Sequence, residues 1–213
     1  MKILALGAHI DDIELACGGT LSLAIERGND VSMVVLSQSA YTSYDGRVIR
    51  TNDVAIEEGK NAAAILGITN LEIWDFPTKD IPYHSEVVER INQKVNDFKP
   101  DIIFTHWPFD THKSHQNTAL SSIAAARYYN TILMYDPIAP AGRSYVGFRP
   151  QVYVDISSHI DKKLNALKAH KSEYGKYGEK WIEGIKARAH YRGYEIGTTY
   201  AEAFEVLRFE LKF

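Results

Sequence analysis

The chain has 213 residues, of which 45% are hydrophobic, and it carries a formal net charge of −3. This length and composition can bury a full core, and no linker-like tract divides the chain, so we expect a single domain over residues 1–213. The negative balance argues against a nucleic-acid-binding protein, and the short apolar run at the start is neither a membrane span nor a cleavable signal. We therefore expect a cytoplasmic protein that does not associate with membranes.

Strands and helices alternate along the first two thirds of the chain. Short apolar runs predict five strands, at 1–8, 31–37, 70–76, 101–106 and 131–136. Segments with helical periodicity, ended by glycine or proline, predict helices at 14–27, 52–66 and 85–98. This alternation predicts an α/β fold of Rossmann-like type, with a mostly parallel sheet, helices on both faces and the strand order 3-2-1-4-5.

Two polar segments follow the first and the fourth predicted strands. The segment at 8–12 reads AHIDD, and the segment at 106–115 reads HWPFDTHKSH. In the predicted order these two strands are neighbours where the winding reverses, so both segments should face the crevice in which open α/β sheets bind ligands. Imidazole and carboxylate groups are good ligands for Zn²⁺, so the pattern indicates a metal site.

The residues of the two segments can have different roles in such a site. His9 and Asp12 can turn toward one ion, which leaves Asp11 free to accept a proton from water. The alternative interpretation of the two aspartates is helix N-capping. His112 and His115 are three residues apart and share a helical face, so one of them can complete the metal site while the other acts on a substrate oxygen or as a general acid.

The other histidines and the single cysteine carry less information. His106 either lines the site or fixes its loop, and Cys17 is expected to be a small buried side chain. Four histidines without acidic neighbours at motif spacing are expected to be ordinary partly buried or surface residues: His84, His159, His170 and His190.

The segment at 8–12, followed by CGGT at 17–20, resembles the signature of the zinc-dependent N-deacetylase family called LmbE-like or PIG-L-like. The segment at 106–115 resembles the second histidine- and aspartate-containing element of that family, and further similarity lies at 62–67, 74–77 and 200–204.

The resemblance implies a specific assignment of roles. Zn²⁺ would be bound by His9, Asp12 and His115, and Asp11 would serve as general base toward water. His112 would stabilise the oxyanion or assist departure of the amine. The substrate would be a small molecule with an N-acetyl group on a glucosamine-type sugar.

One position departs from the family pattern in a way that affects the chemistry. Ser114 stands where the family often has an aspartate, directly before the zinc-binding histidine. A carboxylate there would raise the pKa of a neighbouring imidazole. The charge state of His112 then depends on another carboxylate, for which Asp110 is the candidate.

Three segments are candidates for substrate recognition: 38–50, 135–150 and 170–179. Arginine can grip a phosphate or carboxylate through paired donors, so we expect Arg47, Arg50 and Arg143, together with Asp110, to contact the substrate. The alternative is that these are solvated loop charges. The sequence leaves a homo-oligomer open.

A different class of protein shares part of the pattern. Phospho-receiver domains have an acidic pair, an aspartate and a hydroxyl residue after successive strands, which Asp11, Asp12, Asp75 and Thr105 mimic. They also need a lysine at the end of the fifth strand, which 131–136 lacks, and they would not explain the histidines. Tight zinc binding would favour the hydrolase and weak Mg²⁺ binding the receiver. A metal-binding relative with impaired catalysis is the other alternative, and turnover separates it from the hydrolase.

Overall fold

The computed structural model describes residues 1–137 and 143–211. The strands are β1 (Lys2–Gly7), β2 (Asp30–Ser37), β3 (Tyr41–Thr42), β4 (Val48–Arg50), β5 (Asn70–Phe76), β6 (Ile102–Thr105), β7 (Ile132–Tyr135), β8 (Val152–Asp155) and β9 (Ala201–Arg208). The helices are α1 (Asp12–Glu26), α2 (Asn52–Leu66), α3 (Ser85–Phe98), α4 (Lys113–Ala125), α5 (Ile160–Ala169), α6 (Lys171–Tyr177) and α7 (Glu179–Ile196).

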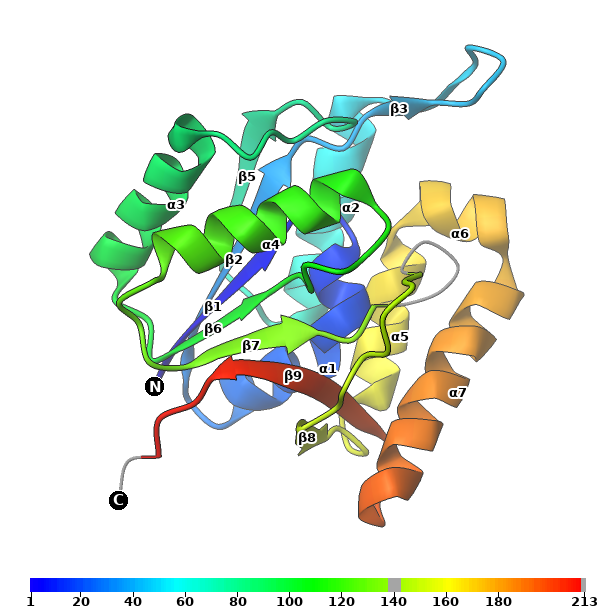
Figure 1. Ribbon diagram of the computed structural model, residues 1–213. Coiled ribbons are helices and arrows are strands. Elements are labelled where there is room, and N and C mark those ends of the chain that lie inside the picture. The colour runs from blue at the N-terminus through cyan, green and yellow to red at the C-terminus, as the bar shows by residue number, and fades with distance from the viewer. Residues whose placement is uncertain (138–142, 212–213) are drawn as a thin grey trace.

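Within the described residues the main sheet has the order β5-β2-β1-β6-β7-β9-β8, and β3 and β4 form a separate hairpin (Figure 1). The first five strands of this order run parallel, so a mostly parallel α/β sheet is confirmed. The predicted order 3-2-1-4-5 covers those five strands but is wrong for the complete sheet, because β9 and β8 extend it in antiparallel fashion. Two buried glutamates interrupt the apolar pattern of β9: Glu202 pairs with Lys163 and Glu205 with Arg149.

The alternation of side chains along the strands builds two apolar layers, one on each face of the sheet. On β1, Ile3 and Ala5 join a core cluster with residues of α1, α2 and α5, whereas Leu4 and Leu6 join a second cluster with residues of α3. The helix α3 buries a stripe spaced three or four residues apart, namely Val87, Ile91, Val95 and Phe98. Helices therefore cover both faces, as predicted (Figure 1).

The turn from β1 into α1 is unusually tight. A Cβ atom added to Gly7 would lie 2.8 Å from Cγ1 of Ile13, so this position requires glycine. Four residues later, the backbone of Asp11 has a φ angle of 127°, which residues other than glycine rarely adopt. Strain of this kind is often retained at functional sites.

The strands β1 and β6 pair directly, with Ile3 opposite Ile102. The segments that follow them, 8–12 and 106–115, therefore meet at the carboxyl edge of the sheet, where α1 and α4 begin. Among the described residues, none of the helices combines the length and the apolar character that a membrane span requires.

Candidate metal centre and catalytic pocket

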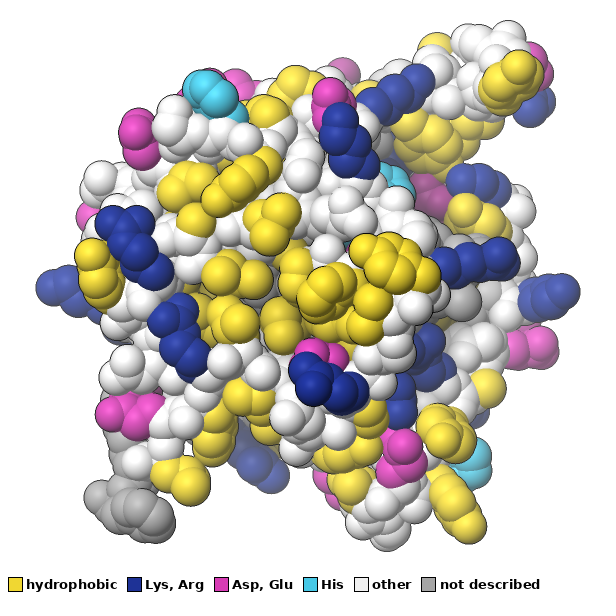
Figure 2. Space-filling view, in the orientation of Figure 1, with side chains coloured by type: hydrophobic (Ala, Val, Ile, Leu, Met, Phe, Trp, Pro, Cys, Tyr) yellow, Lys and Arg dark blue, Asp and Glu magenta, His cyan; other side chains and the backbone are white. Residues whose placement is uncertain are grey.

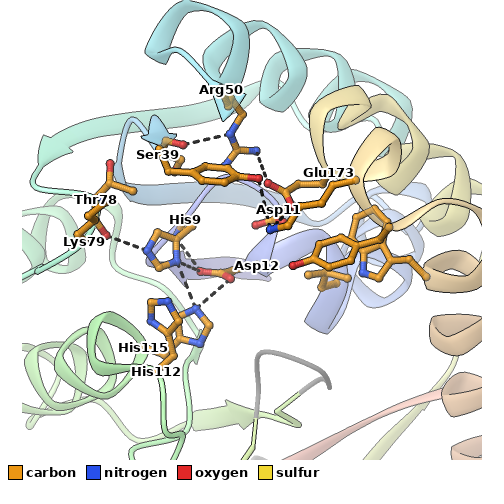
Figure 3. Close-up of a pocket in the computed structure, with 15 residues that line it drawn as sticks. His9, Asp11, Asp12, Ser39, Arg50, Thr78, Lys79, His112, His115 and Glu173 are labelled. Carbon is orange, nitrogen blue, oxygen red and sulfur yellow. Dashed lines mark hydrogen bonds and ion pairs between the residues drawn. The ribbon is translucent and has the colours of Figure 1, made fainter. Parts of the chain in front are cut away.

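Three of the predicted ligands converge on one point (Figure 3). His9 Nδ1 lies 3.2 Å from His115 Nε2 and 3.4 Å from Asp12 Oδ2, and His115 Nε2 lies 3.2 Å from Asp12 Oδ1. Bonds of about 2.0–2.1 Å to a tetrahedral zinc ion separate neighbouring ligand atoms by roughly 3.3–3.4 Å. The spacing of these atoms therefore fits a three-ligand metal site.

The two imidazoles are held so that their free nitrogen atoms face that point. His9 Nε2 lies 3.0 Å from the carbonyl oxygen of Thr78, and His115 Nδ1 lies 2.9 Å from Asp110 Oδ2. Both contacts are hydrogen bonds in which the imidazole N–H donates, which leaves the lone pairs of the other two nitrogen atoms for a cation. Partners of this kind orient metal-binding histidines and raise their basicity.

The charges around the three ligands favour a positive charge among them. Burial alone would lower the pKa of His115, but the Asp12 and Asp110 carboxylates raise it to about 10. Burial would raise the pKa of Asp12, yet His115 and His106 hold it well below its usual range. A proton supplies the positive charge in the metal-free protein, and the same surroundings suit a metal ion.

The position of Asp110 corrects one expectation from the sequence. We predicted that Asp110 contacts the substrate, but it is buried behind His115, and its Oδ1 accepts a hydrogen bond from the backbone N–H of His112. Ser114 is also buried, and its hydroxyl donates to the carbonyl oxygen of Thr78. Asp110 thus places a carboxylate beside the His115 ring, whereas the side chain at 114 provides none.

This contact yields a prediction for metal affinity. We expect Asp110→Asn to weaken zinc binding about 10- to 100-fold, because it removes the charge that supports His115 while keeping the side-chain shape. Competition with a chromogenic chelator measures the affinity. The matched control is Asp80→Asn, which changes an exposed carboxylate paired with Lys113. An affinity of the Asp110 variant equal to that of wild type contradicts the assignment.

Asp11 and His112 line the same pocket as the three ligands, and this pocket has a volume of about 340 Å³. Burial, and then the negative charge of Asp12, raises the pKa of Asp11 to about 8. Burial, and then the positive charges of His115 and His9, lowers the pKa of His112 to about 4. These surroundings favour a neutral His112 imidazole at neutral pH.

The surroundings of His112 leave it available to a ligand. It caps the start of α4, and its ring stacks on that of His115 with the centroids 4.3 Å apart. Its Nδ1 atom is buried and has no hydrogen-bond partner within the part of the chain that the structure describes. A buried polar atom of this kind normally has a partner, so a bound molecule is the natural candidate.

Of the three predicted arginines, Arg50 alone lines this pocket. It is buried, its Nε donates to the carbonyl oxygen of Ser39 at 3.0 Å, and its Nη1 lies 3.7–3.8 Å from carboxylate oxygens of Glu173 and Glu58. Arg47 and Arg143 are exposed and lie outside the pocket. Of the three predicted recognition segments, 38–50 and 170–179 contribute to its wall. The described parts of 135–150 do not line it, and 138–142 lies outside the described residues.

Sequence reasoning left the role of His106 open. Its Nε2 accepts a hydrogen bond from the backbone N–H of Ala8 at 3.0 Å and lies 3.1 Å from Asp12 Oδ2. His106 therefore both fixes the loop and touches a predicted ligand. Among the described residues, two groups of side chains lie close enough together to hold a metal ion: Asp12, His106 and His115, and His9, His112 and His115.

His170 was expected to be an ordinary histidine, but it is fully buried against Glu14, with His170 Nε2 3.1 Å from Glu14 Oε1. The two residues are 156 positions apart, so no local spacing could have indicated the pair. Burial would lower the pKa of His170, and Glu14, followed by Asp11, outweighs burial and raises it. This pair fixes α6 behind the pocket.

The buried pair predicts a pH-dependent contribution to stability. A pKa that is higher in the folded state stabilises the fold fully below the unfolded value of about 6.5, and this contribution is lost as pH rises through the folded-state value. We expect His170→Gln to lower the free energy of unfolding by about 3–5 kcal/mol at pH 6, and the difference from wild type to shrink with increasing pH. Urea denaturation at several pH values measures it. His84→Gln, at an exposed position, is the control; a difference that grows with pH contradicts the prediction.

Known proteins resemble this chain over most of its length. Residues 4–126 match the family described as PIG-L: GlcNAc-PI de-N-acetylase. The diacetylchitobiose deacetylase of Thermococcus kodakarensis is 29% identical over 94% of this chain and 81% of that protein. An uncharacterized deacetylase of Escherichia coli, YaiS, is 32% identical over 80% of this chain and 90% of its own length.

The crystal structure of GalB, the 4-carboxy-2-hydroxymuconate hydratase of Pseudomonas putida KT2440, superimposes with a TM-score of 0.84, covering 100% of this chain and 98% of that one. At 19% identity this likeness shows the fold alone, since one fold can host different reactions. The family match, which spans both histidine-containing segments, excludes the phospho-receiver alternative. Together with the E. coli relative, it shows that the chain belongs to the PIG-L family and is a deacetylase of that family.

Proposed function

We propose that this deacetylase is a zinc-dependent hydrolase that removes the N-acetyl group from an N-acetylglucosamine-type sugar or sugar conjugate. The observation that carries the proposal is that His9 Nδ1 lies 3.2 Å from His115 Nε2, and that each of these atoms lies within 3.4 Å of one oxygen of the Asp12 carboxylate. The T. kodakarensis relative is named for an acetylated disaccharide, which supports a sugar as the substrate.

His9, Asp12 and His115 would hold the zinc ion, in the roles expected from the sequence. When bound, zinc lowers the pKa of water from about 15.7 toward about 7 and polarises a carbonyl group. Three protein ligands leave one position of a tetrahedral ion open, which is typical of catalytic rather than structural zinc sites.

Asp11 is the general base of the proposal. It follows the ligand His9 by two positions and lines the pocket without being one of the three converging groups. The raised pKa of Asp11 makes its deprotonated form a stronger base than an ordinary aspartate, and this form accepts a proton as water attacks the acetyl carbon. The departing amine needs a proton when the amide bond breaks, and Asp11 then holds one, so that acetate and a free amine result.

His112 stabilises the oxygen of the acetyl group as negative charge develops on it. A neutral imidazole has one N–H donor, and the lowered pKa of His112 keeps it neutral. Removing one hydrogen-bond donor to such an oxygen in a water-excluded active site raises the activation free energy by about 2.7–4 kcal/mol in enzymes where this has been measured.

Arg50 and two aromatic residues are proposed to recognise the sugar. Arg50 lines the pocket, so its guanidinium group is placed to donate to a sugar hydroxyl. Tyr177 and Trp181 form an aromatic part of the wall, against which the apolar face of a sugar ring can pack. Arg47 and Arg143 lie outside this pocket, so they are not part of the proposed contact.

Acetate release tests the proposal. Zinc-loaded protein is incubated with N-acetylglucosamine, N,N′-diacetylchitobiose and N-acetylglucosamine 1-phosphate, and acetate is measured by an enzyme-coupled assay. We expect release from at least one sugar, loss of release after chelation, and recovery when zinc is added back. Zinc-loaded protein that releases no acetate from any of them contradicts the proposal and favours the metal-binding relative with impaired catalysis.

A further inference from the structure

The sequence motif CGGT at 17–20 lies within α1 and has no role in the proposed chemistry. The helix is broken there, because Cys17 has a φ angle of −140° and a ψ angle of 19°, which are not helical values. The break divides α1 into a first segment, 12–16, and a second segment, 18–26. The first segment begins with the predicted ligand Asp12, so the geometry of the break affects where that carboxylate lies.

Two charged side chains hold the backbone on either side of the break. In an uninterrupted helix, the N–H of Gly19 donates to the carbonyl oxygen of Leu15. Here the Gly19 N–H donates to Glu202 Oε1 at 3.0 Å, and the Leu15 carbonyl oxygen accepts from Lys163 Nζ at 2.6 Å. The N–H of Thr20 donates to the other carboxylate oxygen of Glu202 at 2.7 Å. Each of these backbone groups therefore has a partner outside the helix, as the end of a helix requires.

The two side chains form a buried ion pair whose charges match the helix ends. Lysine and glutamate side chains stand on the surface of the face drawn in Figure 2, but those of Lys163 and Glu202 are each only 3% exposed. The lysine lies at the carboxyl end of the first segment and the glutamate at the amino end of the second, which is the favourable arrangement. An apolar pair of the same size often stabilises a fold equally well, but it cannot supply these hydrogen bonds to the backbone.

The glycines of the motif let the pair reach the break. A Cβ atom added to Gly19 would lie 2.8 Å from Cδ1 of Ile156, so only glycine allows the residue after β8 to approach this closely. A Cβ atom on Gly18 would lie 3.6 Å from Cγ of Lys163, so the lysine stem already packs against this position. The helix α5, which carries Lys163, lies against α1 (Figure 1).

The space beside the ion pair has no room for a ligand of any size. The cavity that Lys163 and Glu202 line together has a volume of about 20 Å³. This volume accommodates a single water molecule. The role of the pair therefore lies in the backbone that it holds.

The first segment of α1 depends on contacts from outside to keep its position. It is little more than one turn long, and a helix of that length is not stable by its own hydrogen bonds. Its amino end carries Asp12, whose carboxylate must meet His115 from another helix, α4. Near its carboxyl end, the contact between the Leu15 carbonyl oxygen and Lys163 limits rotation at Cys17. A change in the break would therefore shift Asp12 relative to His115.

We propose that Lys163 and Glu202 are positioning residues for the metal site. They fix the break in α1, and the break directs the Asp12 carboxylate toward the ion. This inference rests on the proposed function, because it needs Asp12 as a metal ligand.

The test measures metal binding by the double variant Lys163→Met/Glu202→Gln, which removes both charges together so that neither is left buried alone. We expect Zn²⁺ to bind about 10- to 100-fold more weakly than to wild type, as when a partner of a ligand is lost. Co²⁺ bound in place of zinc should give a visible absorption spectrum that differs from that of wild type, because the spectrum reports the geometry of the ligands. At saturating zinc, kcat should fall by roughly 10²-fold, the effect of a displacement of about 1 Å.

The matched control is Glu205→Gln on the same strand, β9. Glu205 is also buried, accepts a hydrogen bond from the backbone N–H of Arg149 and pairs with its guanidinium group, so the substitution weakens a similar contact away from α1. It should keep the wild-type spectrum, zinc affinity and kcat. Circular dichroism and urea denaturation establish that each protein is folded under the assay conditions. If the double variant does not fold, Glu202→Asp replaces it, because this variant keeps the charge but shortens the side chain that reaches Gly19 and Thr20.

The outcomes separate a positioning role from a purely structural one. A folded variant that is less stable but has the spectrum, zinc affinity and kcat of wild type overturns the inference, because the pair then serves stability alone. A wild-type protein that binds neither Zn²⁺ nor Co²⁺ overturns the proposed function and this inference with it.

Discussion

Asp11→Asn is expected to retain its zinc and to lower kcat by about 10²–10⁴-fold, which is the usual contribution of a general base. The amide cannot accept the proton of the attacking water, but it has the size of the carboxylate. Asparagine also tolerates a positive φ angle, so it suits the backbone at Asp11, where φ is 127°. Steady-state acetate release and zinc content by mass spectrometry measure the two quantities on the same preparation.

Added zinc distinguishes the variant of a general base from the variant of a metal ligand. It can restore activity only where the substitution has weakened metal binding. Because Asp11 is not one of the converging groups, its variant should stay inactive at any zinc concentration. An Asp11→Asn protein that has lost its metal, or one that keeps wild-type kcat, contradicts the assignment of Asp11 as the base.

Asp12→Asn is expected to weaken zinc binding by more than about 100-fold. This loss is larger than the one expected for Asp110→Asn, because Asp110 supports a proposed ligand and is not itself one. The Asp12 carboxylate is buried and contacts both His115 and His106, so we expect its charge to support the site in addition to its proposed role as a ligand. At limiting zinc the variant should have no measurable activity, and added zinc should restore part of it. Chelator competition gives the affinity, and Asp11→Asn is the matched control. Equal zinc affinity in the two variants would reject this division of roles.

The parallel part of the sheet was predictable because its signals are local. Buried parallel strands read as short apolar runs, and the helices between them end one or two residues before Gly28, Gly67 and Pro100. The predicted helix at 52–66 and strand at 70–76 agree with α2 (Asn52–Leu66) and β5 (Asn70–Phe76). Their boundaries carry clear caps, such as Thr51, which accepts a hydrogen bond from the backbone of Val54, and Gly67 in a left-handed conformation.

The C-terminal third was less predictable because its pairing is not local. The strand β9 buries Glu202 and Glu205, whose partners Lys163 and Arg149 come from elsewhere in the chain. A buried charge with a distant partner looks in the sequence like a surface charge. The segment 170–179 was interpreted only as a recognition segment, whereas it contains the helix α6.

In the candidate site too, some features were predictable from the sequence and others depend on contacts that the sequence does not indicate. The two histidine-containing segments could be brought together from the sequence because they follow neighbouring parallel strands, and the family resemblance then indicated His9, Asp12 and His115 as the ligands. The contact of Asp110 with His115 could not be foreseen, because its direction depends on how the loop before α4 folds. The pairing of His170 with Glu14 joins α1 to the residue before α6, and nothing in the sequence spacing indicates it.

Anomalous diffraction at the zinc edge from a crystal of the zinc-loaded protein tests the central claim most directly. We expect one strong peak about 2.0–2.1 Å from His9 Nδ1, from an Asp12 carboxylate oxygen and from His115 Nε2, with the fourth position facing Asp11 and His112. A peak bound by His106 in place of His9, or no peak between these side chains at full zinc occupancy, would contradict it.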